Sequence, residues 1–227
     1  MGKRMKAIQD STDVNQEYNI DEAIKIVKSN AKAKFDESID LSINLNIDPK
    51  YQDQMVREIV QMPEGLGKSI RVAVIARSEK HEDARKAGAD VVGADDLVAE
   101  IKSGKVDFDF CIATPDMMPK VGQLGKVLGP KGLMPNPKLG SVTQDVAKAV
   151  KNAKNGQVEI KAEKAGIVHS QVAKASFTEA KIKNNFMAIF TAIKNAKPSG
   201  VKGTYIKRIY LGSTMGLSVP VAITSLI

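Results

Sequence analysis

The chain has 227 residues, enough for one large domain or two smaller ones, and its single cysteine excludes a scaffold held together by internal disulfides. The net charge of +8 favours a polyanionic partner, and the excess lies in residues 159–227, which hold 10 Lys and Arg against 3 Asp and Glu. The amino-terminal residues lack the apolar stretch of a secretory signal, and no apolar run approaches the roughly 20 residues that cross a membrane. We therefore expect a soluble, cytoplasmic protein with no membrane partner.

The first part of the chain predicts a helix followed by extended strands. Asn19 is expected to cap the helix, with Glu22 three residues later as in a capping box. The apolar stripe of this helix is formed by Ile20, Ala23, Ile24 and Val27. In residues 39–47 apolar and polar side chains alternate, which is typical of a strand in an antiparallel sheet with one face in water. A second extended stretch, residues 55–61, leads to a turn that contains Pro63 and two glycines.

Residues 70–156 follow a different pattern, in which helices alternate with short strands. Residues 70–76 are almost continuously apolar, as expected of a strand covered on both faces. The elements expected after it are a helix at 78–87 capped by Ser78, a strand at 91–92, a helix at 95–103, a strand at 108–113 and a helix at 143–154. Residues 116–140 are rich in Gly and Pro and predict a long loop. This order indicates a small, mostly parallel sheet with helices.

Antiparallel patterns return after Gly156. Strands at 157–162 and 167–172 are expected to pair as a hairpin across residues 164–166. A long amphipathic helix follows, and its buried stripe is Ile182, Phe186, Ile189, Phe190 and Ile193. Strands at 204–211 and 219–223 end the series.

The fold class that these elements predict is α/β and α+β in two domains. Residues 1–67 plus 157–227 would form a discontinuous α+β domain with an antiparallel sheet built from both termini. Residues 68–156 would form an inserted three-layer α/β (Rossmann-like) domain.

Enzyme-like motifs in this chain lack the neighbours that their chemistry needs. Gly67-Lys68-Ser69 resembles the end of a phosphate-binding loop, but Met62 stands where the loop needs glycine, and a strand follows where a helix is required. The turn at 76–79 lacks the glycines of a dinucleotide site. Neither His81 nor His169 has a second ligand at metal-binding spacing. We therefore expect no enzyme, no cofactor and no metal.

Aromatic and basic residues occur together as they do in RNA-binding proteins, where rings stack on bases and cations bind phosphates. Phe35 lies beside Lys34, and Tyr205 and Tyr210 flank a basic pair at 207–208. Burial in the core is the alternative for these rings.

The turn at 213–216 combines hydroxyls for ribose, a methionine for apolar contact and a glycine that lets backbone approach closely. Its alternative is an ordinary connection between strands. His169 follows Lys161 and Lys164 on the basic hairpin and is a candidate contact, with a solvated surface histidine as the alternative.

Several short segments resemble one known family and cover essentially the whole chain. They are Ala33-Lys34-Phe35-Asp36-Glu37, Gly65-Leu66-Gly67-Lys68, Ala113-Thr114-Pro115-Asp116, residues 129–138, residues 166–169, Lys202-Gly203-Thr204 and Thr214-Met215-Gly216. Together they are similar to bacterial large-subunit ribosomal protein one, the family of the ribosome's mobile L-one stalk. Lys131, Ala165 and Leu217 depart from the residues that the family often has there, which are arginine, threonine and proline.

The resemblance implies a structural constituent of the large ribosomal subunit, present there as a monomer. It would bind large-subunit ribosomal RNA beside the exit site for transfer RNA, assist release of deacylated transfer RNA, and repress translation of its own messenger RNA through the messenger's leader. The residues that match the family's RNA contacts are Lys34, Phe35, Ser38, His169, Thr214, Met215 and Gly216.

Two other functions stay open on sequence alone. An enzyme would use the strand end near Thr114 and Asp116, although no acid–base pair accompanies them. A repressor acting on messenger RNA away from the ribosome would need the same RNA surface as a ribosomal protein.

Overall fold

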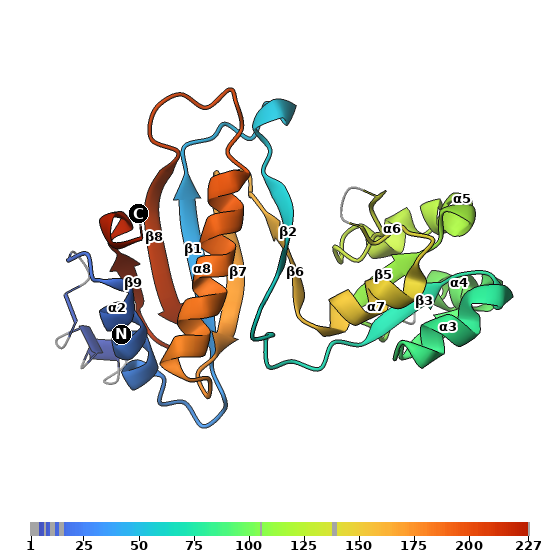
Figure 1. The fold of residues 1–227 in the computed structure, drawn as a ribbon, viewed down its shortest axis with the longest axis horizontal. Coiled ribbons are helices and arrows are strands. Elements are labelled where there is room, and N and C mark those ends of the chain that lie inside the picture. The colour runs from blue at the N-terminus through green and yellow to red at the C-terminus, as the bar shows by residue number, and fades with distance from the viewer. Residues whose placement is uncertain are drawn as a thin grey trace. The chain divides into compact units, whose positions relative to one another are not determined.

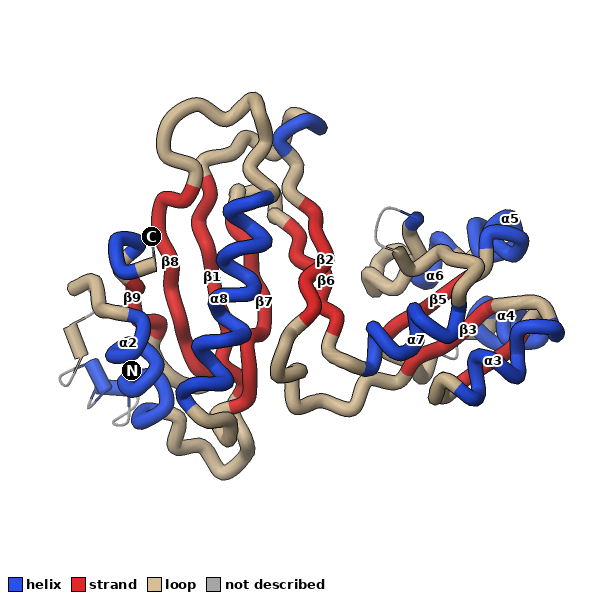
Figure 2. The backbone as a smooth tube through the Cα atoms, viewed as in Figure 1, coloured by secondary structure: helices blue, strands red, loops and turns tan. Residues whose placement is uncertain are grey.

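The computed structural model describes residues 5–6, 8–9, 12–13, 16–104, 106–137 and 140–226, with the backbone alone for Gln52. The fold is mixed, with antiparallel and parallel sheets, and the chain divides into two compact units (Figures 1 and 2). The terminal unit comprises Met1–Gly67 and Val158–Ile227, and the inserted unit comprises Lys68–Gln157. Gln157, expected in the terminal part, groups with the inserted unit. No helix within the described ranges is long and apolar enough to cross a membrane.

A four-stranded antiparallel sheet forms the centre of the terminal unit, in the order β7-β1-β8-β9. Its strands are β1 (Ser38–Leu45), β7 (Ile167–Lys174), β8 (Ile206–Ser213) and β9 (Ser218–Val221). The alternation expected for the first strand is confirmed, because the buried residues of β1 are Ile39, Leu41, Ile43 and Leu45. Successive side chains of a strand point to opposite faces, so β1 has one apolar and one polar face.

Two helices cover the apolar face of this sheet, as Figure 1 shows for the longer one. They are α2 (Ile20–Asn30) and α8 (Glu179–Asn195), and each buries the stripe of residues expected for it. The expected capping box at Asn19 is wrong, because its side chain makes no capping hydrogen bond. The start of α2 therefore rests on the burial of Ile20, Ala23 and Ile24.

The expected hairpin between residues 157–162 and 167–172 is wrong in its pairing. The strand β6 (Gln157–Lys161) pairs with β2 (Arg57–Gln61) in a separate two-stranded sheet, while β7 pairs with β1. Only an isolated bridge between Ala162 and Val168 joins the two segments. Gly166 allows the chain to turn there, since it has φ +74° and lies against the backbone oxygens of Leu45 and Ile47.

The inserted unit has a three-stranded parallel sheet in the order β4-β3-β5. Its strands are β3 (Val72–Ile75), β4 (Val91–Gly93) and β5 (Phe110–Ala113). One face packs against α3 (His81–Lys86) and α7 (Val146–Lys154), and the other against α4 (Asp95–Lys102), α5 (Met118–Gly122) and α6 (Gly125–Leu128). The Cys111 thiol lies in this core, and burial raises its pKa to about 12, so it is a packing residue and not a nucleophile.

Two local expectations for the inserted unit are corrected by the structure. The helix expected from Ser78 begins at His81, after a short 3₁₀ turn in which Ser78 makes no capping hydrogen bond. The long loop expected at 116–140 contains α5 and α6. Apolar residues three or four apart are buried against the sheet and stabilise these turns: Met117, Val121, Leu124 and Leu128.

One buried amide ties the long helix to its surroundings. Asn185 on α8 is fully buried, and its Nδ2 donates hydrogen bonds to the backbone oxygens of Gly65 and Val172, each at 2.8 Å. Its Oδ1 accepts from the backbone N–H of Glu64 at 3.1 Å. The side chain therefore satisfies backbone groups of β7 and of the segment that leads out of the terminal unit.

Replacing Asn185 by alanine should lower the free energy of unfolding of the terminal unit by about 2–4 kcal/mol, because three backbone groups lose their partner. Urea unfolding followed by circular dichroism measures the change. The matched control is Asn184→Ala, since the exposed Asn184 makes one side-chain hydrogen bond, to Glu64 at 3.3 Å. A loss below about 0.5 kcal/mol, the range of ordinary surface changes, would contradict the role given to Asn185.

Candidate nucleic-acid interface

Two loops distant in sequence meet at one end of the four-stranded sheet. One precedes β1, and the other is the turn between β8 and β9. The Ser38 N–H donates to Thr214 Oγ1 at 2.9 Å, and the Thr214 N–H donates to the Ser38 oxygen at 3.0 Å. The Thr214 hydroxyl also donates to that oxygen at 3.2 Å. The Thr214 side chain thus joins the two loops.

A buried carboxylate holds the same two loops from behind. Glu37 is 1% exposed, and its Oε1 accepts from the Ala33 N–H at 2.9 Å. Its Oε2 accepts from the Met215 N–H at 3.0 Å. Backbone donors replace the water that a buried carboxylate would lose, so Glu37 sets the distance between the loops.

The end of β7 completes the arrangement. Lys174 Nζ donates to Ser38 Oγ at 3.0 Å and to the Asp36 backbone oxygen at 3.3 Å. The Asp36 carboxylate accepts from the Ser176 hydroxyl at 2.8 Å and from the Ser176 N–H at 3.1 Å. We call the residues 33–38, 174–176 and 214–216 the loop site.

Apolar side chains project into solvent from this hydrogen-bonded framework. Phe35 is 53% exposed and Met215 is 50% exposed, with the exposed Lys34 beside Phe35. At Gly216 a Cβ would meet Ser213 Oγ, so a side chain there would require the Ser213 hydroxyl to move. Two large apolar groups exposed side by side on a fixed framework make the loop site a candidate binding surface.

His169 lies apart from the other predicted contacts. It is exposed on β7 opposite Ser42 of β1, and its Nδ1 and Ser42 Oγ form a hydrogen bond of 2.9 Å. Ser42 is four residues along β1 from Ser38, about 13 Å at roughly 3.3 Å per residue. The structure therefore brings six of the seven predicted residues together and leaves His169 on the sheet face that α2 and α8 do not cover.

The two tyrosines considered for RNA contact have different environments. Tyr205 is 7% exposed, and burial raises its pKa to about 12, so the hypothesis that this ring faces RNA is wrong. Tyr210 is half-exposed on β8 opposite Ser42. Arg208 Nη1 donates to the Tyr210 hydroxyl at 3.5 Å, and this hydrogen bond raises the pKa of Arg208. With His169, these side chains form a polar row on the open face.

The strand end considered for catalysis lacks the neighbours that catalysis needs. The Thr114 hydroxyl is buried and has no hydrogen-bond partner among the described residues, so no base there activates it. Asp116 forms an ion pair with Arg77 at 3.9 Å. Over the described ranges, no three His, Cys, Asp or Glu side chains lie close enough to hold a metal ion.

The supporting residues of the loop site were not identified from the sequence. Glu37, Lys174 and Ser176 contact partners more than 130 positions away, and such pairs leave no periodic signal in the chain. The only local signal was an acidic pair, Asp36-Glu37, beside an aromatic residue.

Comparison with known families gives a match that covers most of the chain. The model described as "Ribosomal protein L1p/L10e family" matches residues 27–217. This range contains the whole loop site and His169.

Replacing Glu37 by glutamine should disorganise the loop site, because the amide NH₂ would face a backbone N–H as a second donor. We expect a loss of about 1–3 kcal/mol in the free energy of unfolding and faster hydrogen exchange at Met215. The control is Glu163→Gln, an exposed glutamate with no side-chain hydrogen bond among the described residues. Unchanged exchange at Met215 would show that the carboxylate does not hold the turn.

Proposed function

We infer the function from the premise that this chain belongs to the ribosomal protein L1p/L10e family, a family of structural, non-enzymatic ribosomal proteins that bind ribosomal RNA. The finer proposal is that the loop site, together with His169, binds large-subunit ribosomal RNA at the mobile stalk beside the exit site for transfer RNA. The protein would act there as a monomer. Lys34, Phe35, Ser38, Thr214, Met215 and Gly216 are the proposed contacts in the loop site.

The observation that carries this proposal is the exposure of Phe35 and Met215 on a framework whose polar groups are already paired. Stacking on such side chains costs little conformational entropy, because the loops are held by Glu37 and Thr214 before RNA arrives. A stacked base contributes roughly 1–3 kcal/mol. Lys34 stands at the rim to bind phosphate.

The Thr214 hydroxyl has a different role from the one that its residue type suggests. It bonds both backbone atoms of Ser38, so it supports the turn, and its methyl group and backbone are left for RNA. A Thr214→Val change would therefore affect stability as well as binding, and Met215 is the cleaner test.

Transfer RNA would contact a second patch at the opposite end of the terminal sheet. Tyr51 is 59% exposed and Met55 is 48% exposed, and Lys50 and Lys202 are exposed near them. The two loops that hold these residues lie together, since Gly200 is close to Asp53. Rings and cations suit a folded RNA, and this patch supports a role in the release of deacylated transfer RNA.

Repression of the protein's own messenger RNA would use the loop site. A messenger leader that copies the ribosomal RNA surface competes for the same exposed side chains. Free protein, present when ribosomal RNA is saturated, would then bind the leader and block translation.

Crosslinking in cells followed by sequencing of the bound RNA tests the proposal. We expect crosslinks to ribosomal RNA. Phe35→Ala and Met215→Ala should each weaken binding of ribosomal RNA by roughly 1–3 kcal/mol, about 5- to 150-fold in affinity. The chain offers matched controls in Tyr51→Ala and Met55→Ala, which remove a ring and a methionine of similar exposure outside the loop site. These two substitutions should leave binding of ribosomal RNA unchanged and should weaken binding of transfer RNA.

If the two control substitutions weaken binding of ribosomal RNA as much as the two loop-site substitutions do, the proposal that the two patches bind different RNAs is refuted. Crosslinks to the messenger leader alone would favour a repressor that works away from the ribosome.

A shortened chain that joins Gly67 to Gln157 through a short linker should fold and bind ribosomal RNA with unchanged affinity. Each unit has a hydrophobic core of its own, and all the proposed RNA contacts lie in the terminal unit. Filter binding with a large-subunit RNA fragment measures the affinity, and circular dichroism checks the fold. Binding a hundredfold weaker, about 2.7 kcal/mol, by a folded product would make the inserted unit part of the RNA interface.

A further inference from the structure

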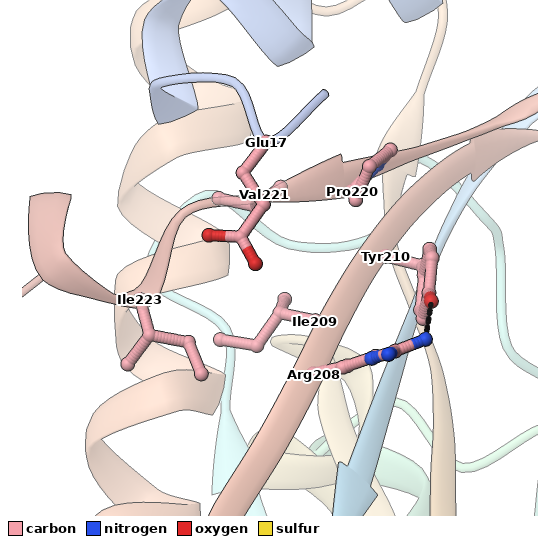
Figure 3. A pocket seen from close by; sticks show the side chains of 7 residues that line it. All are labelled: Glu17, Arg208, Ile209, Tyr210, Pro220, Val221 and Ile223. Carbon is pink, nitrogen blue, oxygen red and sulfur yellow. Dashed lines mark hydrogen bonds between the residues drawn. The ribbon is translucent and has the colours of Figure 1, made fainter. Parts of the chain in front are cut away.

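A small hollow lies at the edge of the four-stranded sheet, outside the loop site (Figure 3). It has a volume of about 240 Å³ and opens where β9 stops pairing with β8. The strand β8 pairs with β1 from Ile206 onward but with β9 only from Ile209, so the end of β8 extends past its neighbour. The hollow is therefore a result of strand length, with the sheet as its rigid wall.

The lining of the hollow combines an apolar floor with charged groups at the rim. Ile209, Val221 and Ile223 form the floor, and the first two are almost fully buried. The Glu17 carboxylate points into the space between them, as Figure 3 shows. Arg208 stands on the other side with its guanidinium bonded to the Tyr210 hydroxyl.

The size of the hollow restricts its occupant. Pockets for drug-sized ligands begin at about 300 Å³, and this one holds 240 Å³. A hollow below that range suits a single planar ring system.

The Glu17 carboxylate selects the chemistry of that ring. It has neither a hydrogen bond nor an ion pair among the described residues, so its acceptor capacity is unused. A carboxylate accepts hydrogen bonds and donates none when ionised. Guanine is the nucleobase with two adjacent N–H donors on one edge, whereas the other bases place a repelling acceptor beside each donor.

We propose that this hollow binds one unstacked guanine of an RNA strand, with Glu17 accepting from its imino and amino groups and Arg208 contacting the adjoining phosphate. The inference rests on the proposed function, because the strand would be part of the RNA held by the loop site. Tyr210 lies on β8 four residues before Thr214, which directly follows the strand, and this separation is about 13 Å at roughly 3.3 Å per residue. An RNA strand that crosses the open face of the sheet past His169 and Ser42 would therefore reach the hollow.

The sign of one substitution separates this site from simple electrostatics. If Glu17 only repels phosphate, Glu17→Gln strengthens binding of every RNA. If Glu17 holds guanine, the same change weakens a guanine-containing strand by about tenfold or more and strengthens the matched strand with adenine in that place. Glu22→Gln removes the same charge from the exposed face of α2 and is the control.

The experiment uses the full chain and has two parts. In the first, guanosine, adenosine, cytidine and uridine 5′-monophosphates are titrated against chain carrying labelled Ile and Val methyl groups. We expect shifts at Ile209, Val221 and Ile223 with the guanosine nucleotide alone, lost in Glu17→Gln. Equal shifts with all four nucleotides, or none at these methyls, would overturn the proposal.

In the second part, single-stranded RNAs with one guanine moved along an adenine strand are bound to wild-type chain, Arg208→Ala and Lys207→Ala. Lys207 is an exposed neighbour on β8 outside the hollow. Arg208→Ala should lower affinity severalfold more than Lys207→Ala, and equal losses would count against the site. If Glu17→Gln changes nothing while Met215→Ala still weakens ribosomal RNA binding, the guanine site fails and the proposed function stands.

Discussion

The terminal unit depends on the position of one strand. The strand β1, from the first part of the chain, lies between β7 and β8 from the last part, and this pairing closes a unit that the inserted residues interrupt. Its four buried residues hold the strand in register, at roughly 1.5–3 kcal/mol for each fully buried large aliphatic side chain. A slip of one residue would put all four into water, so the register is strongly specified.

That register decides where the two loops of the loop site lie. With Ile39 opposite Ser213, the loop before β1 meets the turn after β8, and Glu37 and Thr214 can reach their backbone partners. Phe35 and Met215 are 180 residues apart in the sequence. The meeting of the two loops is what brings them to the same surface. The loop site is thus a product of sheet pairing, and its rigidity comes from paired polar groups beneath an apolar surface.

The two faces of the sheet differ, since one is covered by helices and the other is open and polar. Helices α2 and α8 cover one face and form the core, where the fully buried Asn185 side chain bonds backbone groups. The other face keeps its polar row of His169, Ser42, Tyr210 and Arg208. An antiparallel sheet tolerates this asymmetry, and an RNA-binding protein gains a broad, stiff surface from it.

The sequence alone determined most of the element types, the buried stripes of α2, β1 and α8, and the family, because periodicity and short motifs are local properties. It also placed Lys34, Phe35 and Met215 among the candidate contacts through residue type and resemblance. Only the tertiary structure decided that β6 pairs with β2 instead of β7, that Tyr205 is buried, and that His169 lies about 13 Å from the loop site, at roughly 3.3 Å per residue. It also revealed Glu37 as the link between the loops. These features depend on pairs of residues far apart in the chain, whose contacts form only when both segments bury their apolar faces in the same core.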